Sequence, residues 1–257
     1  GTDEKKTDKD GTAGEAPAQD VLIYAVNGDP QSFNPDMKSD DYAYQINQNI
    51  YNRLVKLNAN DQILPDLAKS WEFSEDGLTL TFHLQEGVKW HDGEPFTSED
   101  VKWTFETMKE YSWTKSDSLA AVTSIECPDE NTVVLNLSQR DVGIVPKLGW
   151  YATFIMPEHI WNDPAYSDFV SNPATWNPVG TGPYKFEKYD AGVGTTLVRN
   201  EDFFGTKATI EKLIFQVIPD QTTAYQSFLN GEVDYLGVTV PTANKHELDN
   251  DSNYKHF

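Results

Sequence analysis

Residues that carry out acid–base, nucleophilic or metal chemistry are present in this chain but are not grouped. The histidines are His83, His91, His159, His246 and His256, and no two of them have the close spacing of a metal-binding pair. The sequence contains no His-Glu-x-x-His, Gly-x-Ser-x-Gly or phosphate-loop motif. With 41 acidic residues some carboxylates must lie near one another, so such a pair would not by itself indicate a glycosidase. We therefore predict no catalytic residue, no metal ligand and no cofactor, and expect that the protein is not an enzyme.

Two short patterns that resemble functional motifs have simpler structural interpretations. Gly192-Val-Gly194 matches the first two glycines of a dinucleotide-binding loop, but Leu197 stands at the third position, so the sequence favours a hairpin turn. His91-Asp92 is a common dipeptide, and its setting among turn residues does not indicate a proton relay. Neither pattern supports an enzymatic function.

The composition is that of an acidic, folded protein. The 257 residues carry a formal net charge of −21, which argues against binding nucleic acid and against docking on anionic lipid through a basic face. Hydrophobic residues make up 38% of the chain, enough to build a core, yet no apolar run approaches the roughly 18 residues that a membrane helix needs. Cys127 is the only cysteine, so no internal disulfide can form.

The periodicity of apolar residues predicts both strands and helices. Residues 21–26 form a continuous apolar run, typical of a strand buried on both faces. Residues 39–54 carry apolar side chains every four positions, which is typical of a helix. Residues 78–84 alternate apolar and polar side chains and therefore predict a strand with one buried face.

Capping residues and turn residues predict the remaining elements. Thr97 and Asp100 form a capping pattern at the start of a helix. Another helix is expected between Asp220, which suits an N-terminal cap, and Gly231, which suits a C-terminal cap. Further strands are expected at 124–127, 132–137, 184–189, 195–199, 213–218 and 233–236, the first two forming a hairpin.

Composition also varies along the chain. Residues 1–20 contain no aromatic and no large aliphatic side chain, so we expect a disordered, charged tether there. All seven tryptophans lie between Trp71 and Trp176. This concentration indicates that the middle of the chain is a unit of its own, inserted into another.

Two long segments resemble a known family. The first runs from Leu64 to Val101 and includes Leu64-Pro-Asp-Leu-Ala-Lys-Ser-Trp71 and Val88-Lys-Trp-His-Asp-Gly93. The second includes Pro178-Val-Gly-Thr-Gly-Pro-Tyr-Lys-Phe186 and Gly231-Glu-Val-Asp-Tyr235. In order and spacing these segments resemble the bacterial solute-binding proteins of the peptide and nickel class (family 5), which are the extracellular components of ABC importers.

The resemblance implies a two-lobed α/β fold of the periplasmic-binding-protein type (type II) that closes on its ligand. The main part of the first lobe would consist of residues 21–47 and 177–257, and a smaller inserted α+β domain would consist of residues 48–176. Members of this family are about twice as long as this chain. The resemblance therefore implies that the second lobe is missing, with the crossover to it near residues 244–257.

The resemblance also implies a function. We expect the protein to capture peptides for an ABC importer and to contact its membrane subunits, either in the periplasm or on the outer cell surface as a lipoprotein, with a lipid anchor as its only membrane attachment. The alternatives are a metal chelate, an oligosaccharide, another small solute, or the role of a peptide-pheromone receptor. The expected ligand-binding residues lie in the loop after the first strand, in the inserted domain and in a glycine turn; they are Phe33, Asn34, Met37, Tyr42, Trp113, Trp150, Gly180, Thr181 and Gly182.

Overall fold

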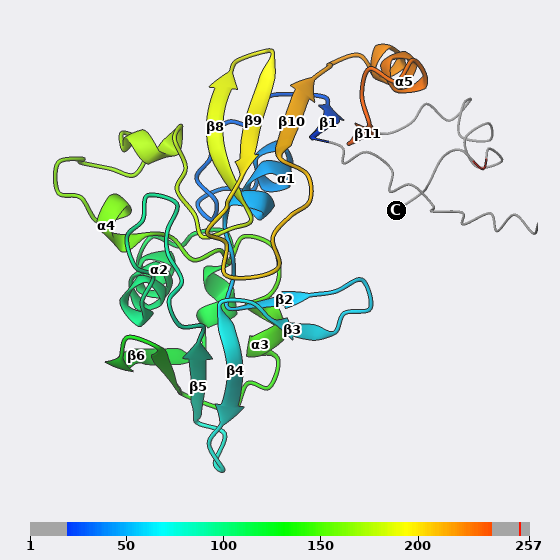
Figure 1. Cartoon of the computed structure of the whole chain (residues 1–257). Helices are drawn as coiled ribbons and strands as arrows, with labels where there is room; N and C mark the ends of the chain where they lie inside the picture. Colours follow the sequence, from blue (N-terminus) through cyan, green and yellow to red (C-terminus); the bar gives the residue numbers. More distant parts are fainter. Residues whose placement is uncertain (1–19, 238–251, 253–257) are drawn as a thin grey trace, which may run out of the picture.

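A computed structural model describes residues 20–237 and residue 252. Asp20 is the only described residue of the predicted tether, and the predicted crossover at 244–257 lies outside the described residues apart from residue 252. The described part of the chain has a mixed α/β fold, as predicted (Figure 1). It contains a five-stranded sheet at one end and a four-stranded sheet at the other.

The five-stranded sheet joins the beginning of the chain to its last third. Its strand order is β11-β1-β10-β9-β8. The strands are β1 (Val21–Val26), β8 (Tyr184–Asp190), β9 (Gly194–Arg199), β10 (Lys212–Val217) and β11 (Tyr235–Leu236). β1 pairs in parallel with β10 and β11, whereas β8, β9 and β10 are antiparallel neighbours. The predicted strands in this part of the chain, and the hairpin turn at Gly192–Gly194, are confirmed.

The prediction that β1 is buried on both faces is wrong for most of its length. Only Ala25 and Val26 are buried, and the first four residues are half-buried. Within the described residues β11 pairs only with Tyr24 and Ala25, so the start of β1 has a neighbouring strand on one edge alone and its other edge is accessible.

α1 (Asp41–Ile50) is shorter than the helix predicted for 39–54. Asp40 caps its beginning, with Oδ1 accepting the backbone N–H groups of Tyr42 and Ala43 at 3.0 and 3.1 Å. After Ile50 the backbone is extended, with φ −110° and ψ 157° at Tyr51. Leu54 is fully buried in this extended segment, so the four-residue spacing from Ile50 to Leu54 reports burial and not helix.

The four-stranded sheet has the order β4-β5-β7-β6. Its strands are β4 (Ala68–Phe73), β5 (Thr79–Leu84), β6 (Val122–Asp129) and β7 (Thr132–Leu137). In β5 the buried and half-buried positions alternate strictly, which confirms the predicted one-sided strand. β6 and β7 form the predicted hairpin, in which Asp129 faces Thr132.

Helices and a small hairpin complete the described fold. α2 begins directly after Thr97 with the predicted capping box, and α5 begins after Asp220 and is followed by Gly231 at φ +74°. The remaining elements are α2 (Ser98–Glu110), α3 (Ile144–Lys147), α4 (Glu158–Trp161), α5 (Gln221–Leu229), the short 3₁₀ helices Ser116–Leu119 and Pro173–Thr175, and the strand pair β2 (Val55–Leu57) and β3 (Ile63–Pro65).

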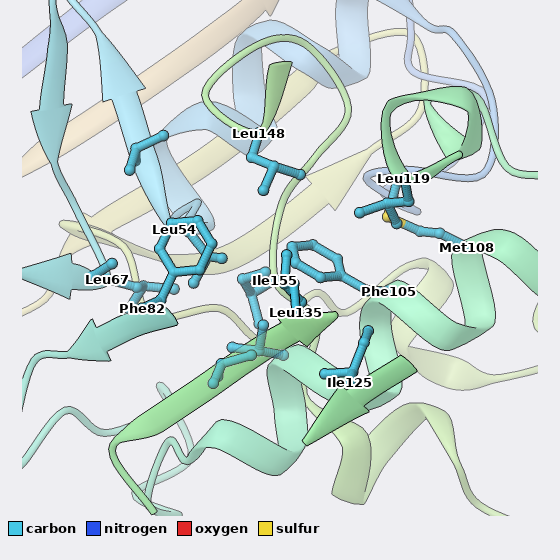
Figure 2. Close-up of a cluster of buried hydrophobic side chains, with 14 of the residues drawn as sticks. Leu54, Leu67, Phe82, Phe105, Met108, Leu119, Ile125, Leu135, Leu148 and Ile155 are labelled. Carbon is cyan, nitrogen blue, oxygen red and sulfur yellow. The ribbon is translucent and has the colours of Figure 1, made fainter. Parts of the chain in front are cut away.

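Two large hydrophobic cores hold these elements together. The larger one packs the four-stranded sheet against α2 and the segments around α3; Figure 2 shows Phe82 of β5 and Phe105 of α2 within it. The other core lies between α1 and the five-stranded sheet and includes Ile46, Ile50 and Phe215. Phe154, which comes from the middle segment, also packs in this second core. The predicted domain boundaries at 47/48 and 176/177 stay a prediction.

Candidate functional site

The loop after β1 is held at both ends by hydrogen bonds. Asp29 accepts the Tyr189 hydroxyl at 3.1 Å and the Gly192 N–H at 3.0 Å, so the loop start is tied to the β8–β9 turn. At the other end, Asp40 Oδ2 accepts the Gln31 N–H at 2.6 Å while its Oδ1 caps α1. One carboxylate therefore orients both the loop and the helix.

Replacement of Asp40 by alanine is expected to lower the free energy of unfolding by about 1–2 kcal/mol, because it removes a helix cap and the bond to Gln31. Urea unfolding of the variant measures this change. Asp41→Ala is the matched control: Asp41 is exposed in the first helical turn, and its loss is expected to cost no more than about 0.5 kcal/mol. Equal effects of the two substitutions would contradict the role of Asp40.

The four predicted ligand-binding residues of this region differ in accessibility. Phe33 is fully buried among aromatic rings, including those of Phe186 and Tyr189. Asn34 is only 7% exposed, and its side-chain oxygen has no hydrogen-bond partner in the described structure. Met37 and Tyr42 are half-buried and pack against the larger and the smaller core respectively. Ligand contact by these four residues stays a prediction.

The turn at Gly180–Gly182 packs directly on the end of α1. The Gly182 N–H donates to the Ile50 carbonyl at 2.7 Å, and Thr181 Oγ1 donates to Asn52 Oδ1 at 2.9 Å. A Cβ atom at Gly180 would lie 2.0 Å from the Ile50 oxygen, and one at Gly182 would lie 2.6 Å from the Asn49 and Ile50 oxygens. These glycines therefore permit close backbone approach within the protein itself; whether they also contact a ligand stays a prediction.

His91 also holds this turn in place through hydrogen bonds, a role that the sequence did not reveal. Its backbone N–H donates to the Gly180 carbonyl at 2.9 Å. Its ring Nδ1 accepts the Gly180 N–H at 3.2 Å, which means that Nδ1 carries no proton. The proton is therefore on Nε2, which donates to the Gly182 carbonyl at 3.0 Å. No local pattern signals this contact, because the partners are about 90 residues apart in sequence.

The surroundings of His91 keep its imidazole neutral. Burial lowers the pKa of His91 to about 4, and the nearby Lys185 ammonium acts in the same direction. The Gly182 carbonyl and the Asp92 carboxylate oppose the shift but do not cancel it. Neutral His91 can accept from one backbone group and donate to the other, and the protonated form cannot.

A second buried titratable group, Asp36, lies beside the predicted loop residues. Its Oδ1 accepts the Phe154 N–H at 3.0 Å, and its Oδ2 has no hydrogen-bond partner in the described structure. Burial raises the pKa of Asp36 to about 8, although the Phe154 amide and the Arg53 guanidinium act in the opposite direction. Asp36 is completely buried and does not offer an exposed anion to a ligand.

The two predicted tryptophans of the middle segment have opposite environments. Trp113 is 5% exposed and packs in the larger core, edge-on to Phe169. Trp150 is 57% exposed and lines an open pocket of about 460 Å³. Most of the accessible surface that lines this pocket is contributed by apolar atoms. The other residues around it include Leu57, Lys115, Ser118, Pro146 and Lys147.

This pocket, called the Trp150 pocket below, lies where β2, α3 and the 3₁₀ helix Ser116–Leu119 meet. Arg53 supports the Trp150 backbone beside the pocket. Its Nε donates to the Trp150 carbonyl at 2.8 Å, and its guanidinium carbon lies 3.9 Å from the centre of the Phe154 ring. A cavity of this size with one aromatic wall is typical of small-ligand sites.

A second pocket of about 470 Å³ lies between α1 and the five-stranded sheet. Tyr24 stacks on Phe215 and contacts Tyr235 there, with ring centres 5.2 and 4.5 Å apart. Gln45 and Gln48 of α1 supply polar side chains, and none of the described residues that line this pocket is charged. Its lining is mainly polar, in contrast to that of the Trp150 pocket.

The described residues offer no ready metal site and no membrane-spanning helix. Among them no group of three or more histidine, cysteine, aspartate or glutamate side chains is arranged to hold a metal ion. Within the same part of the chain no helix has both the length and the apolar character needed to cross a bilayer.

Comparison with known proteins places the chain in a family. The model of the family described as "Bacterial extracellular solute-binding proteins, family 5 Middle" matches residues 62–257. A protein of Brucella suis to which the role of an ABC transporter peptide-binding protein is assigned is 37% identical to this chain over 182 residues. The match covers 69% of this chain and 34% of that protein. The nickel-binding periplasmic protein of Escherichia coli is 30% identical over 236 residues, covering 86% of this chain and 41% of that protein.

The fold agrees with this assignment. The periplasmic binding protein DppA of Helicobacter pylori, solved in complex with the peptide STSA, has a TM-score of 0.78 and 26% identity, covering 91% of this chain and 49% of that chain. The chain thus spans between about a third and a half of the length of these relatives. Because the family match covers most of the sequence, this chain belongs to family 5 of the bacterial extracellular solute-binding proteins.

Proposed function

We propose that this chain is part of the substrate-binding component of an ABC importer and that its cargo is a peptide. The observation that carries the proposal is the Trp150 pocket, which presents a half-exposed indole and an apolar lining of ligand size. Peptide is favoured among possible cargoes because the Brucella relative is described as peptide-binding and the Helicobacter structure holds a peptide.

The chain would bind its cargo and not transform it. Its family is one of solute-binding proteins. His91, whose pKa is lowered by burial, uses both ring nitrogens in hydrogen bonds to backbone groups of the protein itself. The membrane subunits of the importer would be its partners. A position in the periplasm, or on the outer cell surface through a lipid anchor on the parent protein, would suit this role.

The affinity expected for this chain alone is low. If the whole protein bound a peptide with a Kd of about 1 μM, the binding free energy would be about −8.2 kcal/mol. Half of that corresponds to a Kd of roughly 1 mM, which is only a scale because contacts are not additive. Binding should therefore be measured at millimolar ligand concentrations.

A two-dimensional NMR titration of the ¹⁵N-labelled chain tests the proposal. The ligands are a mixture of random tripeptides, the nickel–histidine chelate and maltotriose, each up to several millimolar. We expect saturable shifts with the tripeptides alone. Saturable shifts with the chelate or the sugar, and none with tripeptides, would reject peptide as the cargo.

Capture of a metal chelate is the second candidate, because the Escherichia coli relative is a nickel-binding protein. A chelate needs few protein ligands, so it does not require a cluster of metal-binding side chains. The nickel–histidine arm of the titration decides between the two candidates.

A further inference from the structure

The backbone carbonyl of Trp150 is held by two hydrogen bonds although its side chain is exposed. Its carbonyl accepts hydrogen bonds from Arg53 Nε and from Thr153 Oγ1, both at 2.8 Å. The preceding Gly149 packs so closely on β2 that an added Cβ would lie 3.2 Å from a side-chain carbon of Val55. An exposed indole on a fixed backbone loses little conformational freedom when a ligand covers it.

The pocket beside this indole has apolar walls. Leu57 from β2 and Pro146 from α3 line it together with Trp150. The volume of about 460 Å³ is larger than one amino-acid side chain, so a large aromatic or aliphatic group can enter without displacing the walls.

The charges around the pocket balance. Lys115 and Lys147 are matched by Asp61 and Asp117 among the lining residues. Lys147 pairs with Asp141 at 3.3 Å, whereas the described structure contains no ion pair for Lys115, Asp61 or Asp117. A pocket with two charges of each sign does not favour a cationic or an anionic side chain, even though the chain as a whole carries −21.

We propose that the Trp150 pocket takes a large apolar side chain of the captured peptide, and that Trp150 determines this specificity. The inference rests on the proposed function, since it requires a peptide ligand. It goes further by naming the position on the protein and the side-chain class that this position selects.

The test compares four tripeptides that differ only in the central residue: Ala-Phe-Ala, Ala-Ala-Ala, Ala-Lys-Ala and Ala-Asp-Ala. Their dissociation constants are measured by NMR on the ¹⁵N-labelled chain, and the indole N–H signal of Trp150 is assigned with the variant Trp150→Phe. Ala-Phe-Ala is expected to bind at least about tenfold more tightly than the other three and to shift the Trp150 indole signal.

Two variants locate the effect. Trp150→Ala is expected to abolish the preference for Ala-Phe-Ala, and because the side chain is 57% exposed the variant keeps its fold. Trp176→Ala is the matched control, since its indole is 45% exposed but lies outside the pocket and stacks on Tyr189. It is expected to leave the preference unchanged.

The outcomes separate the two proposals. If all four tripeptides bind equally, or if Ala-Phe-Ala binds without shifting the Trp150 indole, the specificity is overturned while peptide capture stands. If none of the tripeptides binds at several millimolar, the specificity is overturned and peptide capture by this chain fails with it.

Discussion

Replacement of Gly180 by alanine is expected to prevent the chain from folding stably. The new Cβ would lie 2.0 Å from the carbonyl oxygen of Ile50 and 2.6 Å from its carbonyl carbon, and neither backbone atom can move without displacing the end of α1. His91 bonds to both the N–H and the carbonyl of Gly180, so a shift of the turn away from Ile50 would strain these bonds. We expect a loss of more than about 4 kcal/mol, which is a large share of the roughly 5–15 kcal/mol that stabilises a domain.

Thermal and urea unfolding followed by circular dichroism measure this loss. Gly143→Ala is the matched control, because Gly143 has helical angles (φ −83°, ψ −5°) and an added Cβ there would meet only side-chain atoms, Asp141 Oδ1 at 3.4 Å and Lys147 Cε at 3.8 Å. The control is expected to be as stable as the original chain to within about 1 kcal/mol. The packing argument fails if Gly180→Ala unfolds at the same temperature and urea concentration as Gly143→Ala.

Acidification is expected to destabilise the protein through His91. In the folded state the pKa of His91 is about 4, below the ordinary value of 6.5, because burial disfavours the charged ring. Between pH 6.5 and 4 the unfolded chain therefore binds more protons at this residue than the folded chain does. The contribution of His91 to the free energy of unfolding falls as the pH is lowered through this range, by up to about 3 kcal/mol.

Other buried groups act in the opposite direction, so the effect must be measured as a difference. Burial raises the pKa of Asp36 to about 8 and that of Asp66 to about 6, and acidification relieves the cost of burying these carboxylates. The variant His91→Asn keeps an acceptor for the Gly180 N–H but cannot be protonated, and it retains both aspartates. Their contributions cancel when the two proteins are compared.

Urea unfolding of both proteins between pH 7 and pH 4 provides the comparison. At pH 7 the original chain is expected to be the more stable, since His91→Asn loses the bond to the Gly182 carbonyl. This advantage is expected to shrink by up to about 3 kcal/mol at pH 4. A constant difference across this pH range would show that His91 is not held neutral by the fold.

Much of the architecture followed from local patterns. The alternation in β5, the capping box before α2 and the hairpin of β6 and β7 were all predicted, because each depends on residues within a few positions of one another. The end of α1 was not. It is set by the turn at Gly180–Gly182, which lies some 130 residues further along the chain and occupies the space beyond Ile50.

The candidate site shows the same division. By sequence, Trp113 and Trp150 were equal candidates for ligand contact, since both are tryptophans of the inserted segment. The structure buries Trp113 against Phe169 and leaves Trp150 on a pocket wall. The other walls, Leu57 and Lys115, had no local feature that indicated a ligand site.

The sequence alone determined the family resemblance, part of the strand and helix content and the lack of the enzymatic motifs sought, because these depend on the order of residues and on short-range spacing. The tertiary structure alone decided which aromatic side chains are accessible and which titratable groups are buried. Accessibility and pKa depend on the total surroundings of a group, and these are assembled from segments distant in sequence. His91 illustrates the difference. Its neighbours in sequence indicate only a turn residue, whereas in the structure its neutral ring is hydrogen-bonded to the backbone of Gly180 and Gly182.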